Sequence, residues 1–238
     1  AKPKARKAAP ALSEQRFPNE SPAYRRARDK LLQAEMDMRR MQEALAGARR
    51  KLPAGGALSE DYVFEESAEV VGVRKVKLSG LFAPGKDVLV LYSFMYGPAM
   101  ERPCPSCTSI LDALDGNAVA IGQRMNLAVV AKSSLPRILT FAKERGWRHL
   151  RFLSSAGNTY NRDYFGEGED GKQWPMFNVF QKRGDKIHHS WGSELLFVKQ
   201  EKGQNARHVD FMWPLWNVFD ATPIGRGTDW YPKLSYPA

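Results

Sequence analysis

The chain has 238 residues, of which 43% are hydrophobic, so it can bury a full core and does not need the disulfide staples of a small secreted domain. No apolar run approaches the roughly 20 residues of a membrane-spanning helix, and the run Ala1–Lys4 lacks the apolar core of a signal peptide. We therefore expect a cytoplasmic protein with no membrane partner.

The formal net charge of +10 is concentrated at the N-terminus. Residues 1–51 hold 14 Lys and Arg against 6 Asp and Glu, whereas the remaining residues hold 22 against 20. This pattern is typical of a solvated basic tail, and specific nucleic-acid binding is not expected. An alternative is salt-sensitive binding of anionic polymers through residues 1–16.

A helix is predicted from Ser21, a good N-cap that is followed by Pro22 at the first helical position, to a point near Pro53. Apolar residues recur along it at spacings of three and four: Leu31, Ala34, Met38, Met41, Leu45 and Ala48. We expect this seam to pack on the chain's own domain, because fewer than three heptads rarely sustain a coiled coil. A homodimer contact through the same helix is the alternative.

Residues 88–94 form a nearly continuous apolar run, which indicates a strand covered on both faces. The pair Cys104 and Cys107 follows within about ten residues of its end, and apolar residues at helical spacing follow the cysteines. Asp115-Gly116-Asn117 is expected to interrupt that helix, with a further turn or two up to Met125.

Residues 127–131 predict a second buried strand, and a helix should open at Ser134 and close at Gly146. Residues 149–153 predict a third strand, and the Gly-rich stretch 155–172 has no clear period. Residues 176–191, with a turn at 182–185, carry a strong hairpin signal. The predicted fold class is therefore an α/β mixed sheet flanked by helices, with one antiparallel edge.

The run Cys104-Pro105-Ser106-Cys107 lies at the start of the predicted helix. A helix N-terminus offers unpaired N–H groups and the positive end of the helix dipole, which favour a thiolate at the first cysteine. We expect Cys104 to be an exposed nucleophile and Cys107, one turn inside, to resolve a mixed disulfide. Pro105 suits the first turn, where a missing N–H costs nothing, and Arg102 is a candidate for extra thiolate stabilisation.

Other uses of two cysteines at this spacing are less well supported. Zinc normally takes four ligands, and the adjacent His188 and His189 would point to opposite faces of a strand. Covalent haem attachment needs a histidine after the second cysteine, where this chain has Thr108. No metal or other cofactor is therefore expected, and two inert buried cysteines remain the alternative.

The order strand, Cys-x-x-Cys helix, strand, helix, strand, Trp174-Pro175 and hairpin resembles thioredoxin. That resemblance implies a cis bond before Pro175, which would face the dithiol and receive an extended substrate segment. It makes Pro175, Trp174 and Pro105 candidate substrate-binding residues. Thioredoxin has a buried acid on the strand before its dithiol, but alignment of the strands places Ser93 there, so water or Glu101 would have to take the proton of Cys107.

The chain also resembles an uncharacterised bacterial thioredoxin-like family described as predicted dithiol-disulfide oxidoreductases. The resemblance spans about residues 20 to 235 and is carried by four segments: 31–64, 92–98, 104–107 and 221–231. It implies that the N-terminal helix, over 17–56, and the aromatic C-terminal segment belong to one unit, with the helix packed on the domain. From composition alone we expect a basic arm over 1–16 that is disordered or loosely ordered, because it has few apolar side chains. The rest, 57–238, would be a thioredoxin-like domain with an aromatic C-terminal extension.

The leading functional hypothesis is thiol–disulfide exchange with a protein or small-molecule disulfide. A thiol peroxidase of the peroxiredoxin kind is an alternative, although that family has a threonine where this chain has Glu101. A redox-inactive binding scaffold is another, in which Trp213, Trp216 and the aromatic C-terminus would line an interaction surface, although such residues more often pack in a core.

Overall fold

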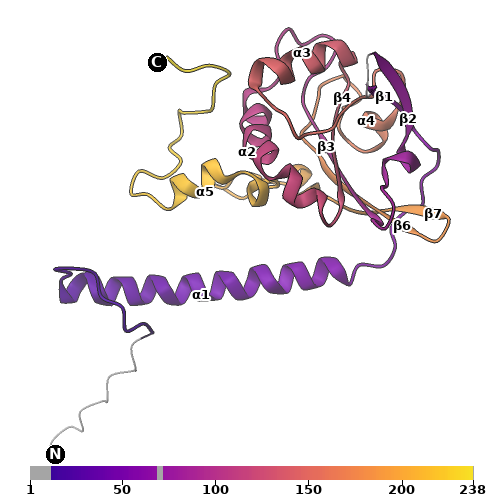
Figure 1. Cartoon of the computed structure of the whole chain (residues 1–238). Helices are drawn as coiled ribbons and strands as arrows, with labels where there is room; N and C mark the ends of the chain where they lie inside the picture. Colours follow the sequence, from indigo (N-terminus) through magenta and orange to yellow (C-terminus); the bar gives the residue numbers. More distant parts are fainter. Residues whose placement is uncertain (1–11, 69–71, 238) are drawn as a thin grey trace, which may run out of the picture. The chain divides into compact units, whose positions relative to one another are not determined.

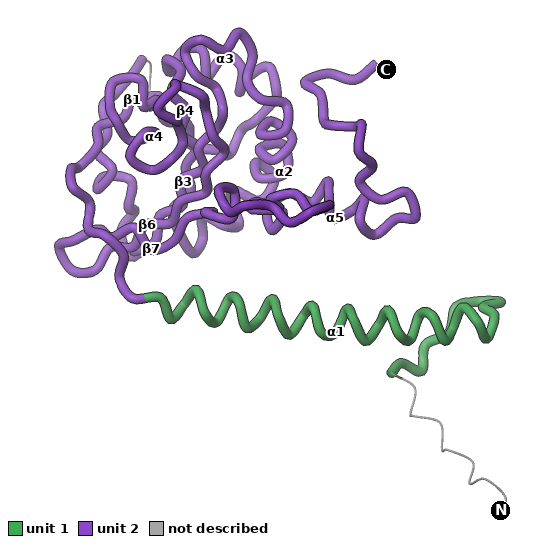
Figure 2. Tube along the Cα trace, turned by 180° about the vertical axis from the view of Figure 1, so that it is seen from behind, with its two compact units in different colours: residues 1–52 green, residues 53–238 purple. Residues whose placement is uncertain are grey.

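The computed structural model describes residues 12–68 and 72–237, which fall into two compact units, one up to Leu52 and one from Pro53 (Figure 2). Residues 1–11 of the predicted basic arm lie outside the described residues. Among the helices that are described, none is both long and apolar enough to cross a membrane.

The first unit is built on helix α1, Pro22–Arg50, which confirms the helix predicted from Ser21. The Ser21 hydroxyl accepts the backbone N–H of Tyr24 at 3.1 Å, and Pro22 occupies the first turn, where its missing N–H costs nothing. No residue of α1 is buried. The packing of α1 on the domain stays a prediction.

The second unit is built on a seven-stranded sheet, as far as the chain is described, with the order β2-β1-β5-β4-β3-β6-β7 (Figure 1). The strands are β1 Val63–Ser67, β2 Val73–Lys77, β3 Val88–Ser93, β4 Asn126–Ala131, β5 Phe152–Ser154, β6 Phe177–Arg183 and β7 Lys186–Gly192. Strands β3, β4 and β5 are parallel, and β6 and β7 form the predicted hairpin antiparallel to β3.

Alternating residues of the central strands bury side chains on both faces of the sheet. On one face, Tyr92 and Val129 pack with residues of α2 (Pro105–Gly122), α3 (Leu135–Arg145) and α5 (Pro214–Asp220). On the other face, Leu89 and Leu91 pack with Tyr160 of the short helix α4, Tyr160–Asp163. The fold is therefore the expected thioredoxin-like mixed sheet flanked by helices. Helix α4 lies within the stretch 155–172, for which the sequence showed no period.

The predicted break at Asp115-Gly116-Asn117 is wrong, because α2 continues without interruption to Gly122. The buried carboxylate of Asp115 accepts three backbone N–H groups, those of residues 148, 149 and 150, at 2.8 to 3.1 Å. Asn117 donates its side-chain amide to the carbonyl of Ala113, one turn earlier. Neither side chain competes with the backbone hydrogen bonds of α2 in a way that would end the helix. The third strand was predicted to begin at residue 149, but the N–H groups of residues 149 and 150 donate to Asp115 and not to a neighbouring strand. Strand β5 therefore starts only at Phe152.

The sheet has a second antiparallel edge, which the sequence did not predict. Strand β1 pairs antiparallel with both β2 and β5. The Glu66 carboxylate, in β1, is buried and accepts from Arg151 at 2.6 and 2.9 Å and from Arg74 of β2 at 2.9 Å. Burial raises the pKa of Glu66, but the two guanidinium groups outweigh it and hold the pKa below its usual value. The prediction of a single antiparallel edge is therefore incomplete.

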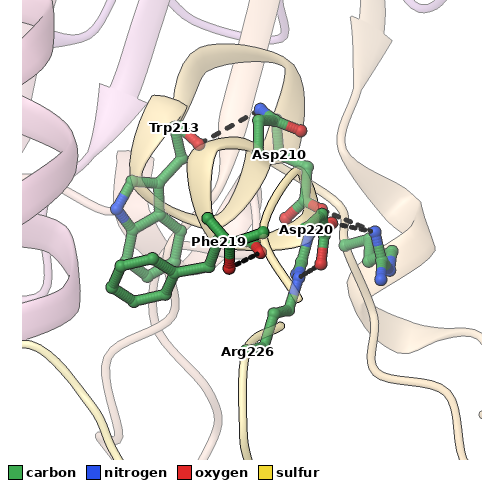
Figure 3. A network of polar contacts seen from close by, with 8 residues as sticks. Asp210, Trp213, Phe219, Asp220 and Arg226 are labelled. Atoms are coloured by element: carbon green, nitrogen blue, oxygen red, sulfur yellow. Dashed lines mark hydrogen bonds and ion pairs between the residues drawn. The ribbon is translucent and has the colours of Figure 1, made fainter. Parts of the chain in front are cut away.

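The aromatic residues of the C-terminal extension pack against one another. Trp213 and Trp216 are 8% and 7% exposed and belong to the core, so they do not line an interaction surface. The Trp230 ring lies 6.0 Å from that of Trp216. The Arg226 guanidinium donates to the carboxylates of Asp210 and Asp220, both at 2.6 Å (Figure 3). Its ion pairs tie the segment after α5 to the segment before it.

Replacing Asp115 by Asn should lower the free energy of unfolding by about 2–3 kcal/mol, because the amide carries no charge and its NH₂ group would lie against the Arg148 N–H that now also donates to Oδ2. Denaturant unfolding followed by circular dichroism measures this loss. Asn117→Ala is the control on the same helix, since this exposed amide donates only to a carbonyl one turn earlier in α2, and it should cost less than about 1 kcal/mol. Equal losses in the two variants would contradict the role given to Asp115.

Candidate functional site

The two cysteines lie where the loop after β3 enters α2. Cys104 is the N-cap of α2 and Pro105 is at its first turn, as predicted. The backbone N–H of Cys104 donates to the Met95 carbonyl at 3.0 Å, and the Thr108 hydroxyl donates to the Cys104 carbonyl at 2.9 Å. The loop and the first turn of the helix therefore hold Cys104 from both sides.

Cys104 is partly exposed, and its thiol is acidic. Hydrogen bonding by the Cys107 side chain is the largest cause, and together with the backbone N–H groups of Cys107 and Ser106 it lowers the pKa to about 6 in spite of burial. At neutral pH this sulfur is therefore mainly a thiolate.

Cys107 has the opposite character. It is 1% exposed, and burial, together with the interaction with Cys104, raises the pKa of its thiol well above the ordinary value. Hydrogen bonds from Tyr92 and from the Met95 backbone oppose this rise without cancelling it. In the dithiol form the pair therefore holds one proton at neutral pH, and that proton stays on the buried sulfur.

Tyr92 is a site residue that the sequence analysis missed. Its hydroxyl lies on β3 and donates to the Cys107 sulfur at 3.3 Å, and both groups are buried. Burial is the main reason that the pKa of Tyr92 is raised, so the hydroxyl keeps its proton. The available signal was the alternation of strand residues, which places Tyr92 on the face of the sheet that α2 covers.

Ser93, where the strand alignment with thioredoxin would place a buried acid, follows Tyr92 in β3 and so points to the opposite face of the sheet, away from this pair. Its side chain is 1% exposed, and within the described residues its hydroxyl has no hydrogen-bond partner. Gly166 approaches it so closely that a Cβ there would lie 2.7 Å from the Ser93 oxygen. A side chain at position 166 would therefore not fit beside Ser93 without a shift of one of the two segments.

Glu101, the candidate proton acceptor, and Arg102, the candidate for stabilising the thiolate, have no contact with the buried pair of Tyr92 and Cys107 among the described interactions. Glu101 is exposed, so it does not share the environment of Cys107. Arg102 donates to Glu144 at 3.1 Å and lies over the Phe141 ring. Arg137 of α3 binds the loop itself, through the carbonyls of residues 98, 100 and 101, and so fixes the path of the chain into Cys104.

The expected cis bond before Pro175 is not present, since no cis peptide bond occurs in residues 12–68 and 72–237. The Met176 N–H donates to the Trp174 carbonyl at 3.1 Å, which makes a γ-turn with Pro175 at its centre. The Met176 carbonyl accepts from the backbone N–H of Ser93 at 2.7 Å, which joins this turn to the end of β3. Where the chain is described, no hydrogen bond or ring contact links Trp174 or Pro175 to either cysteine; Trp174 contacts Phe197.

Two of the hollows on the described part of the domain are well formed, and neither of these is lined by a cysteine. An apolar hollow of about 940 Å³ lies between the C-terminal half of α2 and α5. A smaller one of about 320 Å³, lined by Arg102, Arg137 and Glu144 among others, lies beside the loop that leads to Cys104.

The two adjacent histidines bond to other parts of the chain, His188 to the Gly55 carbonyl and His189 to the Asn178 side chain. The described residues contain no group of three or more His, Cys, Asp or Glu placed to hold a metal ion.

The strand order, the helix positions and a dithiol at a helix N-terminus define a domain of the thioredoxin-like class. Residues 14–236 match a family described as bacterial protein of unknown function (DUF899). The chain belongs to this family.

A search of curated proteins found no match. Among solved structures, a reduced 2-Cys peroxiredoxin of Plasmodium vivax is similar, with 18% identity, a TM-score of 0.44 and coverage of 69% of this chain and 93% of that one. AhpC of Enterococcus faecalis shows 14% identity, a TM-score of 0.46 and coverage of 71% and 93%. An exposed lipoprotein thioredoxin of Streptococcus pneumoniae shows 16% identity, a TM-score of 0.37 and coverage of 64% and 98%.

Alkylation of the thiols should follow the two pKa shifts. With iodoacetamide, the rate at Cys104 should rise with pH around a midpoint near 6, because only the thiolate reacts, and Cys107 should stay unmodified in the folded chain. Mass spectrometry of labelled peptides measures both. Replacing Cys107 by Ala should move the Cys104 midpoint upward; a midpoint near 8.5 in the unmodified protein would contradict the geometry.

Proposed function

We propose that the protein is a thiol–disulfide oxidoreductase in which Cys104 is the nucleophile and Cys107 the resolving cysteine. The observation that carries this proposal is the contrast between the two sulfurs. One is partly exposed with a pKa of about 6, and the other is buried with a raised pKa. Attack on a disulfide needs a thiolate that a substrate can reach, and resolution needs a second thiol that competing oxidants cannot reach.

The proposed reaction has two exchange steps. The Cys104 thiolate attacks a substrate disulfide, forms a new S–S bond, and releases the first substrate sulfur as a thiolate. Cys107 then gives up its proton, which that thiolate can accept, and attacks the Cys104 sulfur. The Cys104–Cys107 disulfide forms, and the second substrate sulfur leaves as a thiolate that is protonated by water. The dithiol loses two electrons and the substrate disulfide gains two.

In this scheme Tyr92 is a positioning residue for the second step. Its hydroxyl is aimed at Cys107 from 3.3 Å, so it would stabilise the negative charge that develops on this sulfur as the proton leaves. It would take over part of the task of thioredoxin's buried acid, but as a hydrogen-bond donor and not as a base.

We propose a protein or small-molecule disulfide as the substrate. Pro105 lies next to the nucleophile and is partly exposed, and Trp174 is 37% exposed, so both can contact a bound chain. The Pro175 carbonyl accepts from His208, with 3.2 Å between the ring nitrogen and the oxygen, so in this arrangement that carbonyl already has a partner. The role of Pro175 would then be to shape the turn that presents Trp174.

The test is to equilibrate the full chain in glutathione buffers of defined ratio and to identify the Cys104–Cys107 disulfide by mass spectrometry. Oxidising ratios should give the intramolecular disulfide, Cys107→Ser should accumulate glutathione on Cys104, and Cys104→Ser should accumulate none. The absence of a disulfide at every ratio would refute the proposal and would favour a redox-inactive binding scaffold.

Peroxide consumption distinguishes the remaining alternative. A thiol peroxidase would consume hydrogen peroxide in a Cys104-dependent way and much faster than it exchanges with disulfides. We expect the reverse order of rates, with Cys104→Ser as the control for both assays.

Replacing Tyr92 by Phe should slow resolution of the Cys104 mixed disulfide about tenfold, the rate equivalent of one hydrogen bond of about 1.4 kcal/mol. Rapid quenching and mass spectrometry follow the decay of the mixed disulfide, and its pH profile should move upward. Ser93→Ala is the matched control, because it removes a buried hydroxyl from the other face of the same strand. If the two variants resolve equally fast, Tyr92 has no such role.

A further inference from the structure

The apolar seam of α1 begins one heptad before Leu31, because Tyr24 and Ala27 also lie within the helix and continue the same spacing. The seam residues Tyr24, Leu31, Met38, Met41 and Leu45 are 49% to 73% exposed. The helix has good caps, but a single helix in water gains little from its own hydrogen bonds and depends on covering its apolar face. The seam therefore needs a partner, and the candidates are this chain's own domain and a second copy of the chain.

The period of the seam favours a second copy. The residues occupy successive a and d positions of a heptad repeat along the whole helix: Tyr24, Ala27, Leu31, Ala34, Met38, Met41, Leu45 and Ala48. A straight helix drifts by about 20° per heptad from a seven-residue repeat, so a helix lying on a globular domain has no reason to keep one over its full length. A supercoiled pair of helices requires a seven-residue repeat along its whole length, because supercoiling keeps the a and d residues facing the partner.

We infer that α1 forms a parallel two-stranded coiled coil with α1 of a second copy of this chain. In a parallel pair, Lys30 at a g position faces the partner's Glu35 at an e position, and two-fold symmetry repeats this contact. Glu35 already accepts from Arg28 of its own helix at 2.9 Å, so two cations would flank this carboxylate.

The antiparallel arrangement is opposed by charge. With the two helices fully overlapped, the symmetry axis falls near residue 36. The two Glu35 carboxylates would then face each other on one side of the core, and the two Asp37 carboxylates would face each other on the other side. Like charges at such distances repel, and the parallel pair avoids this by keeping equivalent residues of each helix on opposite sides of the core.

The test is the mass of the full-length chain in solution, measured by light scattering and by sedimentation over a range of concentrations. We expect a dimer in which Met38→Glu combined with Met41→Glu raises the dissociation constant about a hundredfold or more, because each carboxylate would be buried without a cation. Met36→Glu, at an f position on the opposite side of the same helix, is the matched control and should stay dimeric. Circular dichroism should show that both variants are folded.

Orientation is tested separately with Leu31→Cys in a chain that also carries Cys104→Ser and Cys107→Ser. A parallel pair places the two introduced sulfurs at one core position, so oxidation should link the chains covalently, whereas an antiparallel pair would keep them apart. A monomer at all concentrations would overturn the inference and would favour packing of α1 on its own domain. A dimer that resists Met38→Glu with Met41→Glu would also overturn it, and a seam-dependent dimer without the cross-link would overturn the parallel orientation.

Discussion

Cys107 is buried where α2 meets β3, with the Tyr92 hydroxyl on its sulfur and the Cys104 thiol one turn above it. The chemistry of the domain depends on this contact between a desolvated sulfur and an exposed one. Burial keeps the proton on Cys107, and this proton, with the N–H groups of the first turn, stabilises the charge on Cys104. The sheet positions Tyr92 and the helix positions both sulfurs, so neither element alone would create the difference in acidity.

Much of this fold could be predicted from short-range patterns. The apolar runs in β3 and β4, the cap at Ser21, the left-handed Gly146 that ends α3 and the β6–β7 hairpin all depend on residues within a few positions of one another. The position of the cysteines at the start of α2 followed from the same kind of signal. These elements come from local backbone preference and hydrophobic period, which a sequence displays directly.

What could not be predicted depends on residues far apart in the chain. Asp115 looked like a helix breaker because its three N–H partners lie more than thirty residues further on. Tyr92 looked like one more apolar strand residue, because nothing near it in sequence shows that its hydroxyl reaches Cys107. A cis bond before Pro175 was inferred from a resemblance to thioredoxin, but the described chain has no cis bond there, and Met176 donates to the Trp174 carbonyl in a γ-turn. Side-chain hydrogen bonding across the fold is the physical information that pattern analysis lacks.

The bonds of Asp115 also limit how α2 can move. Its carboxylate joins the middle of the helix to the segment leading into β5, and the Arg145 guanidinium and the Trp147 indole bind Asp112 one turn earlier. The helix is thus anchored between its N-terminal end, which carries the two cysteines, and its C-terminus. If a disulfide forms between the two sulfurs, we expect the backbone to shift only in the first turn of α2 and in the loop before it, while the rest of α2 keeps its position. The domain would present nearly the same outer surface in both oxidation states, so a partner that distinguishes them would have to do so at the dithiol itself.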